Sequence, residues 1–572
     1  MNVYYVGSNS SRFIDLQKKE NSFIALGWDK WDDYSYKTLL PCRLVVDGSE
    51  VEFTNIRILI ENSNFTAQSL DALLASGWDG KFPIPNLNYI SVPSDINFYQ
   101  IVHGKLGIQI AMTVATLFRD ASYLKFVLND QSIVGLIDSG GFKESLMREG
   151  GARKAYQDGW RIFSPQEISQ IDDFQINIPS DNVTVPIKFR FNSKVLPYDI
   201  NVLIGPNGIG KSHCLQLLVE YWLKIGRGDP ANLEKAKVEP FDHYPNLGKL
   251  ILISYSPFEE FTLDLENTNL RDKDAYQYFG FRKKVLDEGG NERIGISRNL
   301  PASDAAMSII RCIEEDEKFN YLPNWVSKFQ SALDVLTEAI DFDDIAIALK
   351  DENESTSILR FTSLVFYQSD PFIEHEGKKF LKLSPVIAQS TERRNFIQAF
   401  DLTQGVVFIK DDRPINLSSG QRLFSYIVIN VLGALKNNSL VVVDEPELFL
   451  HPNLEITFIS LLKSVLEKFC SKAILATHSL VSVREVPANC VHVFRKTDFG
   501  KEVIHPPFET FGGDIQRISS YVFGDRLISK PYQDWISKKL NFYPESDSFI
   551  VALGDEISEE LLMRINKIAK GR

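Results

Sequence analysis

The sequence predicts an α/β fold built on a largely parallel sheet that is covered by helices. Over residues 416–494 the chain alternates helix and strand three times, which is typical of a parallel sheet with helical crossovers. Two strand-like runs, 183–191 and 199–204, lead into a glycine-rich loop and then a helix over 212–224. The apolar run 440–443 ends in two carboxylates, as expected of a buried parallel strand that ends at a ligand-binding sheet edge.

Composition indicates a globular protein of several domains. The chain has 572 residues, of which 44% are hydrophobic and 24% are charged, and both fractions are ordinary for globular proteins. The net charge of −13 argues against binding of nucleic acid through a generally basic surface, and against electrostatic attachment to an anionic membrane. A local basic groove remains compatible with this charge.

The cysteines and the apolar runs point to the cytoplasm. Five cysteines occur without a CxxC pair, which predicts neither a disulfide framework nor a zinc site. The first residues lack the basic and apolar regions of a signal peptide. The most apolar run, 423–435, is shorter than the roughly 20 residues that cross a membrane. We therefore expect a cytoplasmic protein without a membrane partner.

A phosphate-binding loop occupies residues 205–212, which fit G-x-x-x-x-G-K-[ST] at every fixed position. Glycines let the loop point its N–H groups at phosphate oxygens, and the following helix adds a partial positive charge. Lys211 is expected to reach the β- and γ-phosphates of ATP, and the Ser212 hydroxyl to bind Mg²⁺. An ordinary glycine-rich turn is disfavoured by the strand before and the helix after. The expected nucleotide-binding residues are Gly205, Pro206, Asn207, Gly208, Ile209, Gly210, Lys211, Ser212 and His213.

The acidic strand end supplies the second half of this site. Asp444 is expected to hold Mg²⁺, and Glu445 to polarise the attacking water as a general base. A strand often ends in a solvated aspartate, so the pair alone is weak evidence. Together with the phosphate-binding loop it predicts a site for magnesium and ATP.

The segment Leu417-Ser418-Ser419-Gly420-Gln421 resembles the LSGGQ signature of the ABC ATPase superfamily. The resemblance implies a homodimer in which this segment begins a helix whose N-terminus holds the γ-phosphate bound by the other protomer. It also implies nucleotide contacts for Ser418, Ser419, Gly420 and Gln421. After the strand 473–477, His478 matches the family's switch histidine, which contacts the γ-phosphate and holds the attacking water. The implied catalytic residues are Glu445, His478 and Lys211.

Residues 444–452 resemble the D-E-P-E…L-H-P string of SMC-like, RecF-like and prokaryotic defence ATPases. The number of residues between Lys211 and Gly420 is roughly twice that between the same two motifs in the ATPase subunit of an ABC transporter, which implies a helical insertion. The expected organisation is an α+β N-terminal domain of unassigned role at 1–170, an ATPase lobe split between 171–265 and 411–510, a helical insertion at 266–410 and a helical C-terminal tail at 511–572. The strand 250–253 lacks the glutamine that follows it in the family, and Ser256 is the candidate to approach the metal there.

Two functions fit these features. The first is an ATP-hydrolysing switch that controls a partner nuclease or toxin in anti-phage defence, by analogy with the resembling family. The second is a DNA-repair or chromosome-associated ATPase that binds DNA through basic clusters of the insertion at 282–284, 378–382 and 393–394. Each cluster can equally be a solvated helix face. A third function, as the ATPase subunit of a membrane transporter, fits less well than either of these.

Overall fold

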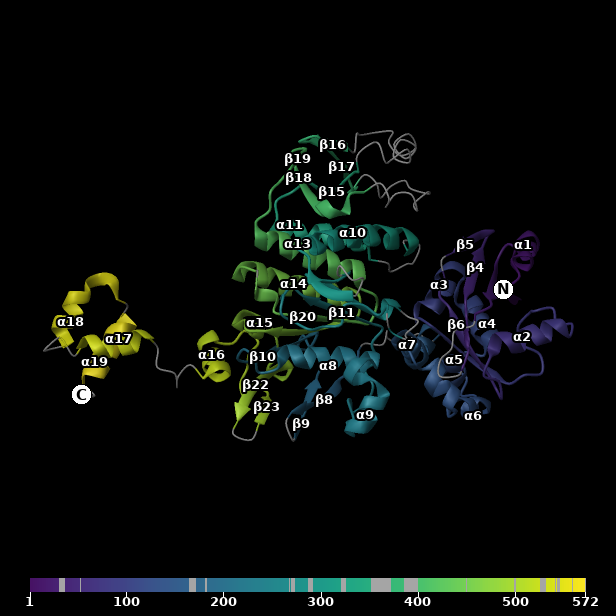
Figure 1. The fold of residues 1–572 in the computed structure, drawn as a ribbon, viewed down its shortest axis with the longest axis horizontal. Helices are drawn as coiled ribbons and strands as arrows, with labels where there is room; N and C mark the ends of the chain where they lie inside the picture. The colour runs from purple at the N-terminus through teal and green to yellow at the C-terminus, as the bar shows by residue number, and fades with distance from the viewer. Residues whose placement is uncertain are drawn as a thin grey trace. The chain divides into compact units, whose positions relative to one another are not determined.

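The architecture was analysed in a computed structural model (Figure 1). It describes residues 1–29, 36–51, 53–163, 171–180, 183–266, 268, 273–286, 292–319, 326–350, 372–384, 400–448, 450–497, 500–524, 531–540, 542, 546–557 and 559–570. The chain divides into two compact units, Met1–Gly512 and Gly513–Arg572. Each is described by itself.

The N-terminal part of the first unit combines two small sheets with helices, as predicted for an α+β domain. One sheet has the order β1-β2-β4-β5 and the other the order β3-β6-β7. Their strands are β1 (Asn2–Gly7), β2 (Phe23–Gly27), β3 (Leu39–Leu40), β4 (Cys42–Val46), β5 (Ser49–Val51), β6 (Ile56–Ile60) and β7 (Tyr89–Pro93). The helices are α1 (Ser10–Lys19), α2 (Thr66–Ala75), α3 (Asn97–Leu106), α4 (Ile108–Phe118), α5 (Ala121–Phe126), α6 (Val134–Ile137) and α7 (Gly150–Asp158).

A seven-stranded sheet forms the centre of the first unit, with the order β12-β11-β20-β21-β10-β22-β23. All neighbouring strands are parallel except β22 and β23, which pair antiparallel. The strands are β10 (Ile200–Ile204), β11 (Lys249–Ser254), β12 (Tyr276–Gly280), β20 (Ser439–Asp444), β21 (Lys472–Thr477), β22 (Val491–Thr497) and β23 (Gly500–Ile504). The α/β fold class is therefore confirmed, and the fully buried β10, β11, β20 and β21 explain why these strands read as continuous apolar runs.

Helices cover both faces of this sheet. Helix α8 (Lys211–Leu223) lies on one side, and α13 (Ser419–Ala434) and α14 (Pro452–Lys468) on the other (Figure 1). The hairpin of β8 (Phe174–Ser180) and β9 (Val183–Phe189) shares the apolar core of α8. The shorter helices are α9 (Pro230–Ala236) and α15 (Leu480–Arg484). Pro452 is at the first position of α14 and His451 caps it, so the L-H-P string marks a helix start.

The close crossing of α10 (Leu300–Phe319) and α13 depends on Gly433. A Cβ on Gly433 would lie 2.6 Å from the backbone oxygen of Ser308. We expect Gly433→Ala to lower stability by about 1–3 kcal/mol, because the two helices would have to separate. The matched control is Gly135→Ala in α6, where a Cβ meets nothing within 4 Å and a gain of about 0.5–1 kcal/mol is expected. Thermal denaturation of both variants measures the difference, and equal midpoints would contradict this packing.

The insertion at 266–410 was expected to be helical, but its described part contains both helices and strands. The expected helices are present as α10 and α11 (Lys328–Ala339). Between them and α13 lies an antiparallel five-stranded sheet with the order β16-β17-β15-β18-β19. Its strands are β15 (Asp344–Ala348), β16 (Phe372–His375), β17 (Lys378–Lys382), β18 (Val406–Lys410) and β19 (Arg413–Pro414), and a separate hairpin joins β13 (Arg282–Leu286) and β14 (Glu292–Ile296).

The basic clusters of the insertion lie on strands, and acidic residues neutralise part of their charge. On β13, Lys284 Nζ is 2.9 Å from Asp264 Oδ1. On β17, Lys382 Nζ is 2.5 Å from Asp412 Oδ1. Arg393 and Arg394 lie outside the described residues. These pairs leave less positive charge for a DNA groove than the sequence indicates.

The second unit consists of helices, as expected of the C-terminal tail. Its helices are α16 (Ile515–Phe523), α17 (Pro531–Leu540), α18 (Ser546–Leu553) and α19 (Glu559–Lys570). A small core is formed by Ile536, Leu540, Phe549 and Ile565. Among the described residues of the whole chain, no helix combines the length and apolar character needed to cross a bilayer. All five cysteines are free thiols.

Candidate nucleotide-binding site

The phosphate-binding loop connects β10 to α8 and is shaped by its glycines. Gly208 has φ +71° and Gly210 has φ +107°, conformations that side chains with a Cβ rarely adopt. A Cβ on Gly205 would lie 2.6 Å from the backbone oxygen of Phe494 in β22. Ile209 is buried and joins the apolar core under α8, whereas Pro206, Asn207 and Gly208 are exposed. The loop is therefore anchored by one apolar side chain and leaves its tip open for a ligand.

Lys211 begins α8 and is buried inside the loop. Its Nζ donates to the backbone oxygens of Gly205 at 3.1 Å and Pro206 at 3.2 Å, and lies 2.7 Å from His478 Nε2. Burial lowers the pKa of Lys211, although the charges of Glu445 and Asp444 oppose that effect. A buried ammonium that is held by neutral acceptors favours an anion, so this cradle fits a phosphate group.

The predicted metal ligands meet where β20 ends. Ser212 Oγ donates to Asp444 Oδ1 at 3.0 Å. Among the described residues, no group of three or more His, Cys, Asp or Glu could hold a metal by itself. Mg²⁺ is usually held by one or two protein oxygens together with substrate phosphates and water. One hydroxyl and one carboxylate beside a phosphate cradle therefore fit Mg²⁺ bound with a nucleotide.

Metal binding at Asp444 should depend on pH. Burial raises the pKa of Asp444 to about 7 in spite of the hydrogen bond from Ser212, and the charge of Glu445 adds to the rise. A proton therefore competes with the metal below that pH, and we expect the Mn²⁺ affinity with a non-hydrolysable ATP analogue to fall by up to about tenfold per unit. Above pH 7 the affinity should level off. An affinity that is unchanged from pH 8 to pH 5.5 would contradict this view of Asp444.

Glu445 and His478, which the resemblance implies to be catalytic, lie beside Lys211. Glu445 has φ +51°. Residues other than glycine rarely adopt this left-handed backbone conformation, and such strained residues concentrate at functional sites. Glu445 Oε1 is 3.7 Å from His478 Nε2. Burial, with the nearby charge of Lys211, lowers the pKa of His478 to about 4. The imidazole is therefore neutral at physiological pH, so its nitrogen accepts from Lys211 and forms no ion pair with Glu445.

Glu447 contacts the predicted site, although the sequence motifs assigned it no role. Its Oε1 accepts a hydrogen bond from the backbone N–H of His478 at 2.5 Å. Burial raises the pKa of Glu447. The contact ties the segment after β20 to the end of β21, so Glu447 positions His478. The D-E-P-E string contained this signal, because it places a second acid two residues after Glu445.

The segment after β11 contains Ser256, which is expected to approach the metal, and the acidic residue Glu259. Ser256 Oγ accepts a hydrogen bond from the Phe258 N–H at 3.4 Å, and this serine is half-buried. Glu259 is instead the buried acid of this segment, at 8% exposure, and its charge contributes to the raised pKa of Asp444.

The signature segment lies apart from these contacts. Ser418 caps α13, and Ser418 and Gln421 form a capping box. Both Ser418 and Ser419 are exposed. In the described part of the chain, no hydrogen bond joins residues 417–422 to the phosphate-binding loop. The structure of one chain therefore assembles the loop, Asp444, Glu445 and His478, and leaves the signature residues free at a helix N-terminus.

Two further cations approach this region. Lys501 Nζ of β23 lies 3.0 Å from the position that a Cβ on Gly210 would take. His213 faces Arg227, and the Nη1 atom of Arg227 is 3.3 Å from the Nδ1 atom of His213. Burial and the charge of Arg227 lower the pKa of His213. His213 thus has a neighbour within the chain in addition to the expected role in nucleotide binding.

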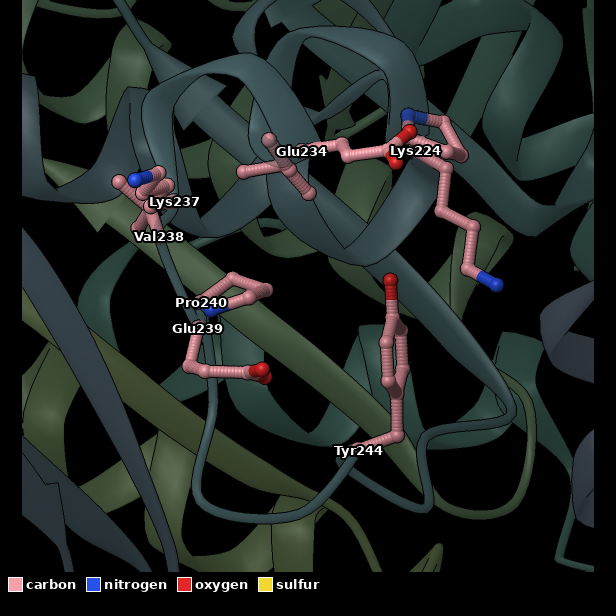
Figure 2. A pocket seen from close by; sticks show the side chains of 9 residues that line it. Lys224, Glu234, Lys237, Val238, Glu239, Pro240 and Tyr244 are labelled. Carbon is pink, nitrogen blue, oxygen red and sulfur yellow. The ribbon is translucent and has the colours of Figure 1, made fainter.

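A cavity of about 510 Å³ lies at the other end of α8 and is distinct from the phosphate cradle (Figure 2). Lys224 and Tyr244 lie next to each other in its lining, with Lys224 Nζ 5.0 Å from the centre of the Tyr244 ring. Burial and the neighbouring Arg153 lower the pKa of Lys224 to about 8. None of the phosphate-binding residues lines this cavity.

Comparison with known proteins agrees with the geometry. Residues 343–484 match the family described as "AAA domain, putative AbiEii toxin, Type IV TA system". The match includes the signature segment, Asp444, Glu445 and His478, and the phosphate-binding loop precedes it. The chain therefore has an α/β fold in which a phosphate-binding loop follows a strand of a largely parallel sheet.

Three further proteins are similar to the chain at low sequence identity. "Protein ea59" of Escherichia phage lambda is 22% identical over 554 residues, which span 92% of this chain and 91% of that protein. The SmcHead bound to the C-winged helix domain of ScpA is 11% identical, with 59% of this chain and 98% of that chain covered and a TM-score of 0.28. A nucleotide-free ATP-binding cassette from an ABC transporter is 13% identical, with 54% and 82% covered and a TM-score of 0.21. The fold class is instead defined by the seven-stranded sheet and by the loop 205–212 that follows β10.

Proposed function

We propose that the chain binds ATP with Mg²⁺ at the loop 205–212 and hydrolyses it. The observation that carries the proposal is the convergence of Lys211, Ser212, Asp444, Glu445 and His478 at one sheet edge. Lys211 lies 2.7 Å from His478, and Ser212 lies 3.0 Å from Asp444. Groups from three parallel strands are thereby placed around one phosphate cradle.

Each residue has a distinct role in this proposal. Lys211 exchanges its loop carbonyls for phosphate oxygens and neutralises their charge. Ser212 and Asp444 hold Mg²⁺, which supplies charge neutralisation on the phosphates when it is bound. Glu445 accepts a proton from the attacking water, and neutral His478 holds that water and the γ-phosphate. Glu447 keeps the His478 backbone in place.

The proposal includes a homodimer, because the signature residues of one chain reach none of these groups. Ser418, Ser419, Gly420 and Gln421 begin a 16-residue helix, and a helix N-terminus attracts negative charge. In a two-fold dimer, this helix start of one chain would close on the γ-phosphate held by the other chain. ATP would then bring two chains together, and hydrolysis would release them.

We further propose that this cycle controls a separate effector in the cytoplasm, a nuclease or a toxin, in anti-phage defence. The match to a family described with a toxin and a toxin–antitoxin system supports a role of this class. Purification of the chain with the products of its neighbouring genes tests it. Co-elution of an effector whose activity changes with ATP is the expected result, and an effector that is indifferent to ATP would contradict the switch.

A further inference from the structure

Glu259 is a buried carboxylate with one oxygen that has no hydrogen-bond partner, and the charge of Arg282 acts on it from nearby. The residue is 8% exposed. Its Oε1 accepts a hydrogen bond from Tyr278 Oη at 2.7 Å. Its Oε2 is buried and has no hydrogen-bond partner. A buried acceptor without a partner destabilises the folded protein, so a ligand that donates a hydrogen bond there would remove that cost.

The strand register places Glu259 at the metal end of the site. Ser254, the last residue of β11, pairs with Asp444, the last residue of β20. The segment that follows Ser254 is fixed to α8 by a hydrogen bond from Gln216 Nε2 to the Glu260 backbone oxygen, at 3.3 Å. Gln216 lies one helical turn after Ser212. Tyr278 of β12 holds the carboxylate from the outer side of the sheet. Glu259 therefore lies on the side of Asp444 that faces β11.

The chemistry of Mg²⁺ explains what such a carboxylate can do. Mg²⁺ keeps several water molecules when it binds to proteins. Those waters donate hydrogen bonds to carboxylates around the site, and such outer contacts contribute to metal affinity. Glu259 would act in this way as an outer contact of the metal, through a metal-bound water. Its neighbour Glu260 is exposed and cannot share this role.

We propose that Glu259 accepts a hydrogen bond from the water shell of the nucleotide-bound divalent cation. This inference rests on the proposed binding of ATP and Mg²⁺. It assigns metal affinity to a residue five positions beyond the end of β11. Tyr278 is the positioning residue, because its hydroxyl orients the carboxylate.

Binding of Mn²⁺ tests the proposal without turnover. Electron paramagnetic resonance measures free Mn²⁺ during titration of the full chain with a saturating non-hydrolysable ATP analogue. Glu259→Gln keeps the size of the side chain and should weaken Mn²⁺ binding about 10- to 100-fold, the usual range for outer contacts. Glu260→Gln is the matched control and should bind Mn²⁺ as the wild type does. Tyr278→Phe should weaken binding by a smaller factor, which provides a second variant if Glu259→Gln does not fold.

The outcomes separate this inference from the proposed function. A fluorescent ATP analogue with EDTA measures nucleotide binding in the absence of metal. If the wild type binds the nucleotide and Mn²⁺, and folded Glu259→Gln binds Mn²⁺ within twofold of it, the role of Glu259 is wrong and the proposed function stands. If the wild type binds neither the nucleotide nor Mn²⁺, the role of Glu259 and the proposed function are both wrong. Equal losses in Glu259→Gln and Glu260→Gln would also overturn the inference, because they would indicate a general charge effect.

Discussion

Glu445→Gln should abolish ATP hydrolysis while ATP stays bound. Glutamine keeps the shape of Glu445 at φ +51° but cannot accept the proton of the attacking water. Loss of a general base lowers turnover about 10²- to 10⁴-fold. Because the phosphate cradle is intact, the variant should accumulate as ATP-bound dimers. Phosphate release measures the first effect, and light scattering with and without ATP measures the second.

The control for this variant is Glu467→Gln. Glu467 is exposed on α14 and should change neither turnover nor mass. Turnover of Glu445→Gln within threefold of the wild type would show that another group activates the water. A monomer that is unchanged in the presence of ATP would contradict the proposed dimer.

Lys211→Ala should remove nucleotide binding. Lys211 Nζ contacts two loop carbonyls and His478. When a nucleotide binds, phosphate oxygens would replace these partners. Two charge-assisted hydrogen bonds of roughly 1.5–3 kcal/mol each correspond to at least about a 100-fold loss of affinity. Because burial already lowers the pKa of this amine, the variant without ligand should be no less stable than the wild type. Calorimetric titration with a non-hydrolysable ATP analogue measures the affinity.

Lys235→Ala provides the comparison, because Lys235 is exposed on α9. Its affinity should equal that of the wild type. An equal affinity in Lys211→Ala would show that the loop does not hold the phosphates.

The sequence predicted the phosphate-binding side of the site because motif and topology agree. The loop 205–212 follows a buried strand, and Asp444 and His478 each follow another. Carboxyl ends of parallel strands meet at one sheet edge, so local reading of three short segments was enough to bring Lys211, Asp444 and His478 together.

The rest depends on contacts that local patterns do not encode. Glu259 lies in an irregular segment, and only the pairing of β11 with β20 places it near Asp444. The strands β15, β17 and β18 of the insertion are five residues each, and their pairing joins segments far apart in the chain. A run such as Lys378–Lys382 reads as a charged helix face until its sheet partners are known.

In the proposed dimer each ATP site is shared by two chains, and mixing two inactive variants tests this sharing most directly. Lys211→Ala disables the phosphate cradle, and Ser419→Arg blocks the exposed start of α13. In a heterodimer of the two, one site carries both defects and the other carries neither. With random pairing of equal amounts, about one quarter of the sites are intact. If the sites are shared, the mixture regains ATP hydrolysis to about that fraction, although each variant alone is inactive. A mixture no more active than the sum of its components would contradict it.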